Sequence, residues 1–149
     1  MTAPSHLLVA VDFNETSEHA LERALDLAAR LSARVTVLHV YSLPSLRVGD
    51  SDFIPSADEA ARVTAAAEKG LDELVAKHRR EGVEMARLLR SGRPPADEIC
   101  ASAVELGADL IVVGTHGRGA IGRALLGSVA LDVLRQATVP VMSVHEKRA

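Results

Sequence analysis

A phosphate-binding loop is indicated by four residues in the last third of the chain: Gly114, Gly117, Gly127 and Ser128. They follow a short apolar run, 109–113, that is typical of a buried parallel strand, and they precede a predicted helix over 129–136. Backbone N–H groups converge where such a loop enters a helix, and glycine lets a phosphate approach the backbone closely. The sequence therefore predicts a site for a phosphorylated ligand, and a nucleotide fits this pattern best.

Two other glycine patterns overlap this loop, and neither has the context that it requires. The segment from Gly117 to Gly122 matches G-x-G-x-x-G, but a dinucleotide site needs that pattern directly after its strand and an acidic residue at the end of the next strand. The segment from Gly122 to Ser128 resembles a P-loop without its lysine, the residue that holds the β- and γ-phosphates during transfer. Phosphate binding through backbone N–H groups and the Ser128 hydroxyl is still expected, whereas fast hydrolysis is not.

Three side chains in or beside the loop could also face the phosphates. Arg118 and Arg123 carry positive charge, and His116 lies between two loop glycines. For Arg123, phosphate contact and solvent exposure are equally open. The remaining histidines show no metal-ligand spacing with one another or with Cys100, so neither a metal site nor a catalytic residue is predicted.

The elements that must position this loop alternate between strands and helices. Apolar runs predict strands at 7–11, 35–40, 83–89, 109–113 and 139–144. Amphipathic spacing predicts helices at 17–31, 56–81, 95–107 and 129–136. Because crossovers between parallel strands are right-handed, we expect an α/β fold in which helices cover both faces of a five-stranded parallel sheet, with strand order 3-2-1-4-5.

Several helix ends carry local signals. Ser17 is the expected N-cap of the first helix, Ser56 begins a capping box with Glu59, and Gly82 is the expected stop of that second helix. Gly107 suits a left-handed C-cap. The segment 41–55 contains Pro, Gly, Ser and Asp, and we expect a long irregular loop that serves as a lid or a partner surface.

Asp12 follows the first predicted strand, at a position where this kind of sheet binds ligands. The strand order reverses between the first and fourth strands, so Asp12 and the Gly114 loop should be neighbours in space. A phosphorelay receiver also has an acid here, but it needs an aspartate after the third strand and a lysine after the fifth, where this chain has Arg90 and His145. Capping of its own loop is the weaker alternative for Asp12.

Composition limits the class of protein. The chain of 149 residues is expected to form one domain over 1–149, with 48% hydrophobic and 25% charged residues. The net charge of -3 and the lack of a basic run argue against nucleic-acid binding, and no apolar run reaches the length of a membrane span. The chain has one cysteine, and its first segment, 1–6, does not resemble a signal peptide, so we expect a cytoplasmic protein.

The spacing from Gly114 to Ser128 is also the G-x2-G-x9-G-[ST] signature of ATP-binding universal stress proteins, and the chain resembles that family along nearly its whole length. Val9-Ala-Val-Asp-Phe-Asn-Glu-Thr-Ser17 resembles its first strand, Asp loop and first helix, and Leu38-His39-Val40 its second strand end. Gly127-Ser-Val-Ala130 and Val139-Pro-Val141 resemble its closing segment. Many members have Gly-Ser after the aspartate, whereas this chain has Phe13-Asn14.

The resemblance implies a role for individual residues. Asp12 would bind the adenosine end through ribose or adenine, beside the backbone of Ala10 and Val11, and Val40 would offer its backbone to the adenine edge. The phosphates would be held by Gly114, Gly117, Gly127 and Ser128, with Val129 supplying an N–H group. Val113, His116 and Arg118 are further candidate nucleotide-binding residues of this stretch.

The resemblance also implies a function. The expected protein is a cytoplasmic, ATP-binding regulator or sensor in the stress response, with ADP or AMP as alternative ligands and Mg²⁺ accompanying the phosphates. Two chains would pair as a homodimer through 139–144. A slow ATPase or phosphoryl- or nucleotidyl-transfer enzyme is one alternative, although the missing loop lysine argues against efficient turnover. A scaffold with an empty nucleotide site, acting through 41–55, is another.

Overall fold

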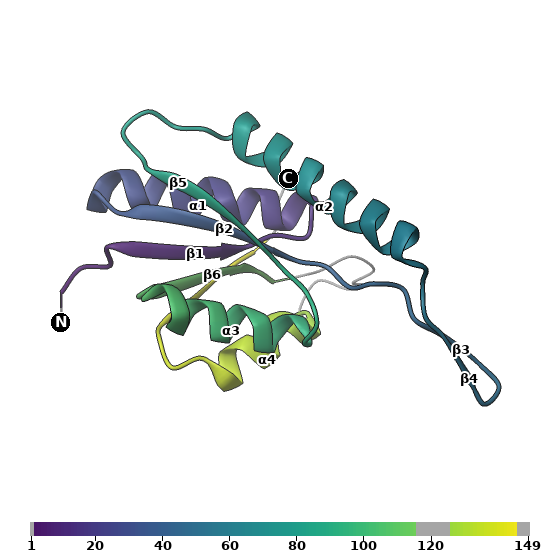
Figure 1. Ribbon diagram of the computed structural model, residues 1–149. Coiled ribbons are helices and arrows are strands. Elements are labelled where there is room, and N and C mark those ends of the chain that lie inside the picture. The colour runs from purple at the N-terminus through teal and green to yellow at the C-terminus, as the bar shows by residue number, and fades with distance from the viewer. Residues whose placement is uncertain (1, 116–125, 146–149) are drawn as a thin grey trace.

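A five-stranded parallel sheet forms the centre of the computed structural model, which describes residues 2–115 and 126–145 (Figure 1). Its strands are β1 (His6–Ala10), β2 (Arg34–Val40), β5 (Met85–Arg90), β6 (Leu110–Gly114) and β7 (Val141–Val144). They lie in the order β5-β2-β1-β6-β7. Counted along the chain, the five strands of this sheet have the predicted order 3-2-1-4-5, and the predicted fold class is confirmed.

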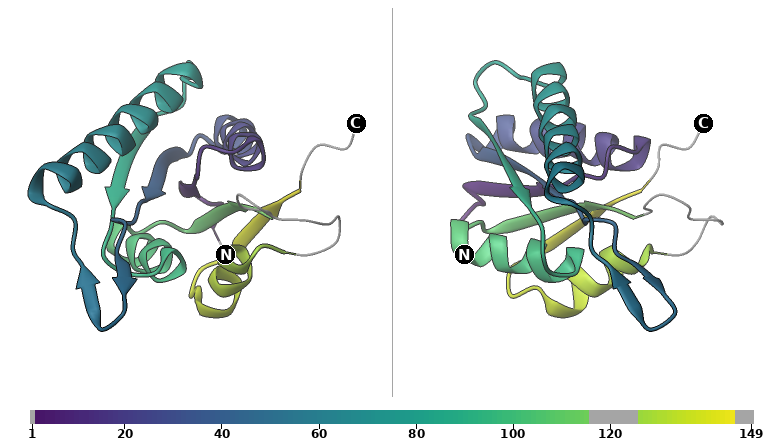
Figure 2. Two further views of the ribbon diagram at one scale, coloured as in Figure 1. Left: turned by 90° about the vertical axis from the view of Figure 1, so that its right-hand side faces the viewer. Right: turned by 45° about the vertical axis from the view of Figure 1, so that its right-hand side comes forward.

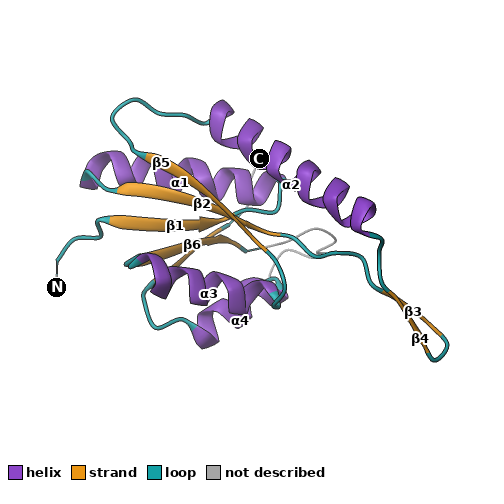
Figure 3. Cartoon of the chain, in the orientation of Figure 1, coloured by secondary structure: helices purple, strands orange, loops and turns teal. Residues whose placement is uncertain are grey.

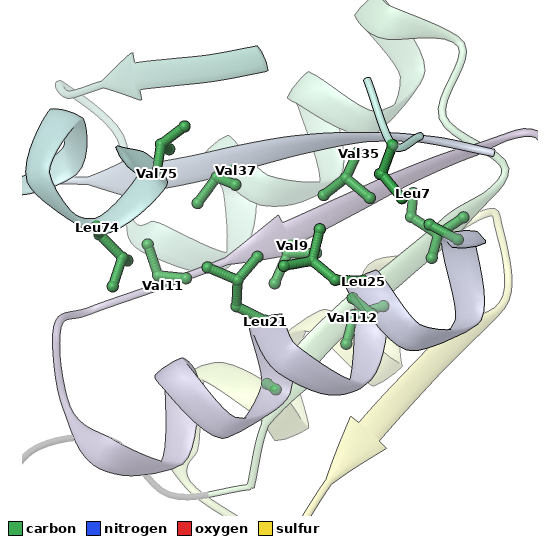
Figure 4. Close-up of a cluster of buried hydrophobic side chains, with 14 of the residues drawn as sticks. Leu7, Val9, Val11, Leu21, Leu25, Val35, Val37, Leu74, Val75 and Val112 are labelled. Carbon is green, nitrogen blue, oxygen red and sulfur yellow. The ribbon is translucent and has the colours of Figure 1, made fainter. Parts of the chain in front are cut away.

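Two helices cover each face of the sheet, as predicted (Figure 2). They are α1 (Glu15–Leu31) and α2 (Ala57–Lys77) on one face, and α3 (Pro95–Leu106) and α4 (Ser128–Gln136) on the other. Alternate residues of β1 point to opposite faces, so Leu7 and Val9 join the first core and Leu8 the second. Figure 4 shows how valine and leucine side chains of the sheet and of α1 interlock in the first core.

Three local predictions at helix ends are confirmed. Ser56 and Glu59 form the capping box of α2, Pro95 is the first residue of α3, and Gly107 ends α3 with a φ of 64°. Each depends on a few neighbouring residues, so the local sequence suffices to predict it.

Three other boundaries differ from the prediction. Asn14 is the N-cap of α1 instead of Ser17, because the Asn14 side-chain oxygen accepts from the Ser17 amide at 2.7 Å while the Ser17 hydroxyl bonds elsewhere. Helix α2 ends at Lys77 instead of residue 81, since Lys77 and His78 both turn to Glu18 of α1. Gly82, with a φ of 82°, lies in the turn before β5, which begins at residue 85 instead of 83.

The segment 41–55 is not an irregular loop. It contains an antiparallel hairpin of β3 (Leu46–Val48) and β4 (Ser51–Phe53) that projects from the sheet and its helices (Figure 3). The two-residue turn is formed by Gly49, at a φ of 65°, and Asp50. Gly-Asp is a known hairpin signal, but the strands on either side of it are only three residues long. Phe53, the last residue of the hairpin, and Ile54, which follows it, are 56% and 79% exposed.

No helix within the described part of the chain is long and apolar enough to cross a membrane.

We expect the protein to lose stability as the pH falls below the ordinary histidine value of 6.5. His6 is buried in β1, with Nε2 2.8 Å from the Thr36 hydroxyl. Burial, and then Arg34, lower its pKa, while the Leu106 carbonyl and the charges of Asp109 and Glu84 only partly oppose this. The unfolded chain therefore binds a proton more readily than the folded one, so stability present above pH 6.5 is lost on acidification.

The measurement is urea unfolding at about pH 7.5 and about pH 5.5, a range in which histidine is the main titrating side chain. The wild type should lose more unfolding free energy between the two than a His6→Gln variant does. Equal losses in both proteins would show that His6 carries none of this dependence.

Candidate functional site

The candidate site lies at the carboxyl edge of the sheet, between β1 and β6. The last register pairs are Ala10 with Leu38 and Val9 with Val112, so the residues that follow all emerge at one edge. On one side of β1 lies β2, which follows it in the chain after α1. On the other side lies β6, which comes from much later in the chain. Sheets of this type leave a crevice for ligands at such a reversal of strand order.

Asp12 is built into the start of α1. Its amide donates to the Ser17 hydroxyl at 3.2 Å, and its two carboxylate oxygens accept from the backbone and side-chain nitrogens of Asn14, each at 3.3 Å. Asn14 in turn caps the helix. The half-buried carboxylate is therefore held by the residues that begin α1, with long hydrogen bonds that leave it able to accept from another donor.

The backbone just before Asp12 is fixed by β2. The Val11 amide donates to the Leu38 carbonyl at 2.8 Å, and the Val11 carbonyl accepts from His39 Nδ1 at 2.7 Å. His39 has no metal-ligand spacing in the sequence, and in the structure it makes this hydrogen bond beside the site. The ring of Phe13 lies against the His39 ring, with centroids 4.3 Å apart.

Gly114 is needed for the packing of α1 against β6. A Cβ atom on Gly114 would lie 3.0 Å from Thr16 Cγ2, 3.2 Å from the Thr16 carbonyl carbon and 3.3 Å from the Ser17 amide nitrogen. Two of these neighbours are backbone atoms that cannot move without shifting the helix. The predicted closeness of Asp12 and Gly114 is thus realised through the first turn of α1, which contacts both.

The two ends of the glycine loop meet at Thr115. The Gly127 amide donates to the Thr115 carbonyl, and the Thr115 amide donates to the Val144 carbonyl at 3.0 Å. The Thr115 hydroxyl is buried and has no hydrogen-bond partner in the part of the chain that the structure describes. Thr115 is not among the predicted site residues, because its burial depends on segments that are distant in sequence.

Helix α4 begins directly after Gly127, and no side chain among residues 2–115 and 126–145 caps its N-terminus. Gly127 is the N-cap and offers no side-chain acceptor. The first intrahelical bond joins the Leu131 amide to the Gly127 carbonyl at 3.0 Å, so the amides of the first turn have no acceptor within the helix. Ser128 and Val129 are exposed there. Free N–H groups at the positive end of a helix can bind an anion.

Val40 ends β2 on the other side of β1, half-buried, and Tyr41 follows it. The Tyr41 amide donates to the Arg90 carbonyl at 3.0 Å, and its hydroxyl lies 3.0 Å from that of Thr64 on α2. Hydrogen bonds from Ser91 and then Thr64 hold the pKa of the Tyr41 phenol below its usual value. The end of β2 is therefore fixed to both β5 and α2.

The structure thus brings most of the predicted site residues to one edge: Ala10, Val11, Asp12, Val40, Val113, Gly114, Gly127, Ser128 and Val129. His116, Gly117 and Arg118, like Arg123, lie outside the described residues, and their roles stay predictions. Among residues 2–115 and 126–145, no three His, Cys, Asp or Glu side chains gather as metal ligands.

This arrangement combines a carboxylate acceptor, a helix N-terminus and a buried hydroxyl at one edge of the sheet, and the described residues provide neither a side-chain cap for the helix nor a partner for the hydroxyl. A carboxylate accepts hydrogen bonds from ligand hydroxyl groups, and the N–H groups at a helix N-terminus donate to phosphate oxygens. A ligand with a sugar at one end and phosphate at the other meets both requirements, so the residues present fit a nucleotide.

Comparison with known proteins agrees with this chemistry. Residues 4–145 match the profile of the Universal stress protein family. The universal stress protein YxiE of Bacillus subtilis is 33% identical to this chain over 147 residues, which cover 93% of this chain and 97% of YxiE.

Two similar solved structures contain nucleotides. One is the universal stress protein from Archaeoglobus fulgidus in complex with dAMP, with a TM-score of 0.67 and 29% identity, covering 97% of this chain and 99% of that one. The other is a universal stress protein in complex with cAMP, with a TM-score of 0.65 and 26% identity, covering 97% and 98%.

Proposed function

Because the chain belongs to the universal stress protein family, we propose that it binds ATP at the carboxyl edge of its sheet and acts as a nucleotide-dependent regulator in the stress response. ADP and AMP are the alternative ligands. The observation that carries the proposal is the start of α4 beside the bond between Gly127 and Thr115, at the same edge as Asp12 and with no side-chain cap from the part of the chain that the structure describes. The protein would act in the cytoplasm as one domain over 1–149.

Support for an adenine nucleotide comes from the relatives. Two universal stress proteins of similar fold are in complex with dAMP and with cAMP, and each ligand is an adenine nucleoside with one phosphate. The choice of ATP for this chain depends on the glycine spacing, which provides N–H groups for more than one phosphate. The neighbouring structures hold monophosphates, so ligand length is the point that an experiment must decide.

Each residue has a proposed part in binding. The Asp12 carboxylate accepts from the ribose or the adenine, and the backbone of Ala10, Val11 and Val40 lines that end. Phosphate oxygens accept from the amides of Ser128 and Val129 and from the Ser128 hydroxyl. The phosphate end is completed by the end of β6 and the stretch that follows it: Val113, Gly114, His116, Gly117, Arg118 and Gly127.

Mg²⁺ would accompany the phosphates. This cation is commonly bound through substrate phosphates, water and one or two carboxylates, so it needs no preformed cluster of protein ligands. The absence of a loop lysine favours retention of the nucleotide over its hydrolysis, because that lysine stabilises the charge of transferred phosphates. A slow ATPase is the alternative that the same experiment separates.

The test uses the purified protein without added ligand. Heat denaturation followed by ion-exchange chromatography identifies any nucleotide that was retained, and calorimetric titration with ATP, ADP and AMP, each with and without Mg²⁺, ranks the ligands. We expect tighter binding of ATP with Mg²⁺ than of AMP. ATP consumption is followed separately in the same preparation.

Three outcomes are informative. No binding of any adenine nucleotide at millimolar concentration would refute the proposal and would favour a scaffold acting through the 41–55 hairpin. Tighter binding of AMP than of ATP would show that AMP is the ligand instead of ATP. Multiple turnovers of ATP that Ser128→Ala abolishes would favour an enzyme.

We also propose a homodimer in which two copies of the strand segment 139–144 pair antiparallel. Strand β7 is the outer strand of the sheet, so its free edge presents unpaired backbone groups. The carbonyls of Pro140 and Val144 accept from the Ile111 and Thr115 amides of β6, which directs the backbone groups of Ser143 to the outside.

Sedimentation equilibrium at micromolar concentration should therefore give a dimer for the wild type. Ser143→Pro should give a monomer that is still folded, because proline removes one outward N–H and leaves the bonds to β6 intact. A wild type that is entirely monomeric, or a variant that is still dimeric, would contradict pairing through this strand.

A further inference from the structure

Phe13 adopts a backbone conformation that its side chain disfavours. It lies between Asp12 and the N-cap Asn14 with a φ of 64°, in the left-handed region. Glycine enters that region freely, whereas a bulky residue does so only where surrounding contacts compensate. The contacts of Phe13 should therefore explain why the loop after β1 holds this conformation.

The Phe13 ring is held between β2 and α2. On one side lies the His39 ring, at a centroid distance of 4.3 Å and an interplanar angle of 41°. On the other side, a Cβ atom on Gly70 of α2 would lie only 3.3 Å from Phe13 Cζ and 3.5 Å from Cε2. The ring thus occupies the space that any larger residue at position 70 would need.

The same contacts fix the loop that carries Asp12. His39 holds the Phe13 ring and also donates to the Val11 carbonyl, one residue before Asp12. Asn14, one residue after Phe13, contacts the Asp12 carboxylate. Residues 11–14 are therefore anchored on both sides of Asp12, and the Phe13 ring is their contact with α2.

Helix α2 has a second contact with the start of α1. Glu18 accepts from Lys77, and from His78 Nε2 at 2.6 Å, and these hydrogen bonds lower the pKa of the Glu18 carboxyl. Glu18 follows Ser17, whose hydroxyl accepts from the Asp12 amide. The position of α2 is thus coupled at two points to the turn that presents Asp12.

We infer that Phe13 is a positioning residue for nucleotide binding: lodged between His39 and Gly70, its ring holds the left-handed turn that presents the Asp12 carboxylate. This inference rests on the proposed function. It assigns Phe13 no contact with the nucleotide and makes helix α2, through Gly70, a determinant of affinity. The alternative is that Phe13 only fills the space under α2 and affects stability alone.

The first test is a double-mutant cycle read by calorimetric titration with ATP and Mg²⁺. Phe13→Gly keeps access to the left-handed conformation and removes the ring, and it should weaken ATP binding about tenfold. In an Asp12→Asn background the same change should weaken binding less than about twofold, because the carboxylate that the ring positions is already gone. Phe13→Leu, which keeps apolar bulk, should recover part of the affinity.

A second test acts from α2 and covers the case in which Phe13→Gly does not fold. Gly70→Ala brings a methyl group against the ring. Because alanine is the better helix former, the urea midpoint should stay level or rise, while ATP binding weakens about threefold. In a Phe13→Leu background, adding Gly70→Ala should cause no further loss of ATP affinity, because the smaller leucine side chain leaves room for the methyl group.

The outcomes separate the two proposals. A wild type that binds no nucleotide refutes both the proposed function and this inference. If the wild type binds ATP and both Phe13→Gly and Gly70→Ala bind it with the wild-type affinity, only the positioning role is refuted. Losses that add fully to that of Asp12→Asn would also overturn it, since Phe13 would then act independently of the carboxylate.

Discussion

Replacing Gly127 with aspartate is expected to abolish nucleotide binding while the fold stays intact. Gly127 is the N-cap of α4 with a φ of -58° and a ψ of 154°, a conformation that any residue adopts. An aspartate there would accept from the free amides of the first turn, which favours the helix by a few tenths of a kcal/mol relative to glycine. The same carboxylate would take the amides proposed for phosphate and would repel it.

The expected loss of ATP affinity is at least about 100-fold, because two charge-assisted hydrogen bonds are replaced by a like-charge contact. Titration calorimetry measures it, and thermal unfolding without ligand serves as the stability readout. Gly127→Asn is the matched control: it caps the helix without the charge, so its affinity should lie between those of the wild type and the aspartate variant. Unchanged ATP affinity in Gly127→Asp would show that α4 does not bind the phosphates.

Replacing Gly114 with valine is expected to cost about 2–3 kcal/mol of unfolding free energy, the usual effect of overpacking a tight contact. The added Cβ would meet the backbone of Thr16 and Ser17 at 3.2 and 3.3 Å, so β6 and the first turn of α1 would have to separate. Because that turn also bonds to the Asp12 amide, nucleotide affinity should fall along with stability.

Urea unfolding without nucleotide measures this effect, with Gly114→Ala as the smaller step. Alanine adds the Cβ alone and should cost less than valine, while both variants keep the wild-type slope against urea concentration if the native state stays well packed. A valine variant as stable as the wild type would mean that α1 tolerates displacement at this contact. Gly114 would then matter for ligand approach only.

The general architecture could be predicted from the sequence because it follows from local patterns. Continuous apolar runs such as 7–11 and 110–113 are stable only when both faces of a strand are buried, which requires a parallel sheet between helix layers. Connections that are right-handed then leave few topologies, and the order with β1 in the centre is among them. The capping box at Ser56 and the C-cap at Gly107 likewise depend on adjacent residues alone.

Part of the candidate site could be predicted in the same way. Asp12 follows a buried strand, and Gly127 with Ser128 precedes a helix, so their place at the carboxyl edge follows from the order of elements. Thr115 escaped prediction because its significance comes from a buried hydroxyl without a partner among the described residues, and burial depends on segments that are distant in sequence. The small hairpin at 46–53 was missed because its strands are three residues long.

The parallel sheet, the resemblance to the family and the phosphate-binding pattern could all be predicted, because each follows from the order and spacing of residues along the chain. Two features of the site become apparent in the folded protein alone: Gly114 is required by the approach of α1, and Phe13 takes a left-handed turn against Gly70. Each of these depends on contacts whose free energy overrides local preference, and only the folded chain brings the contacting segments together.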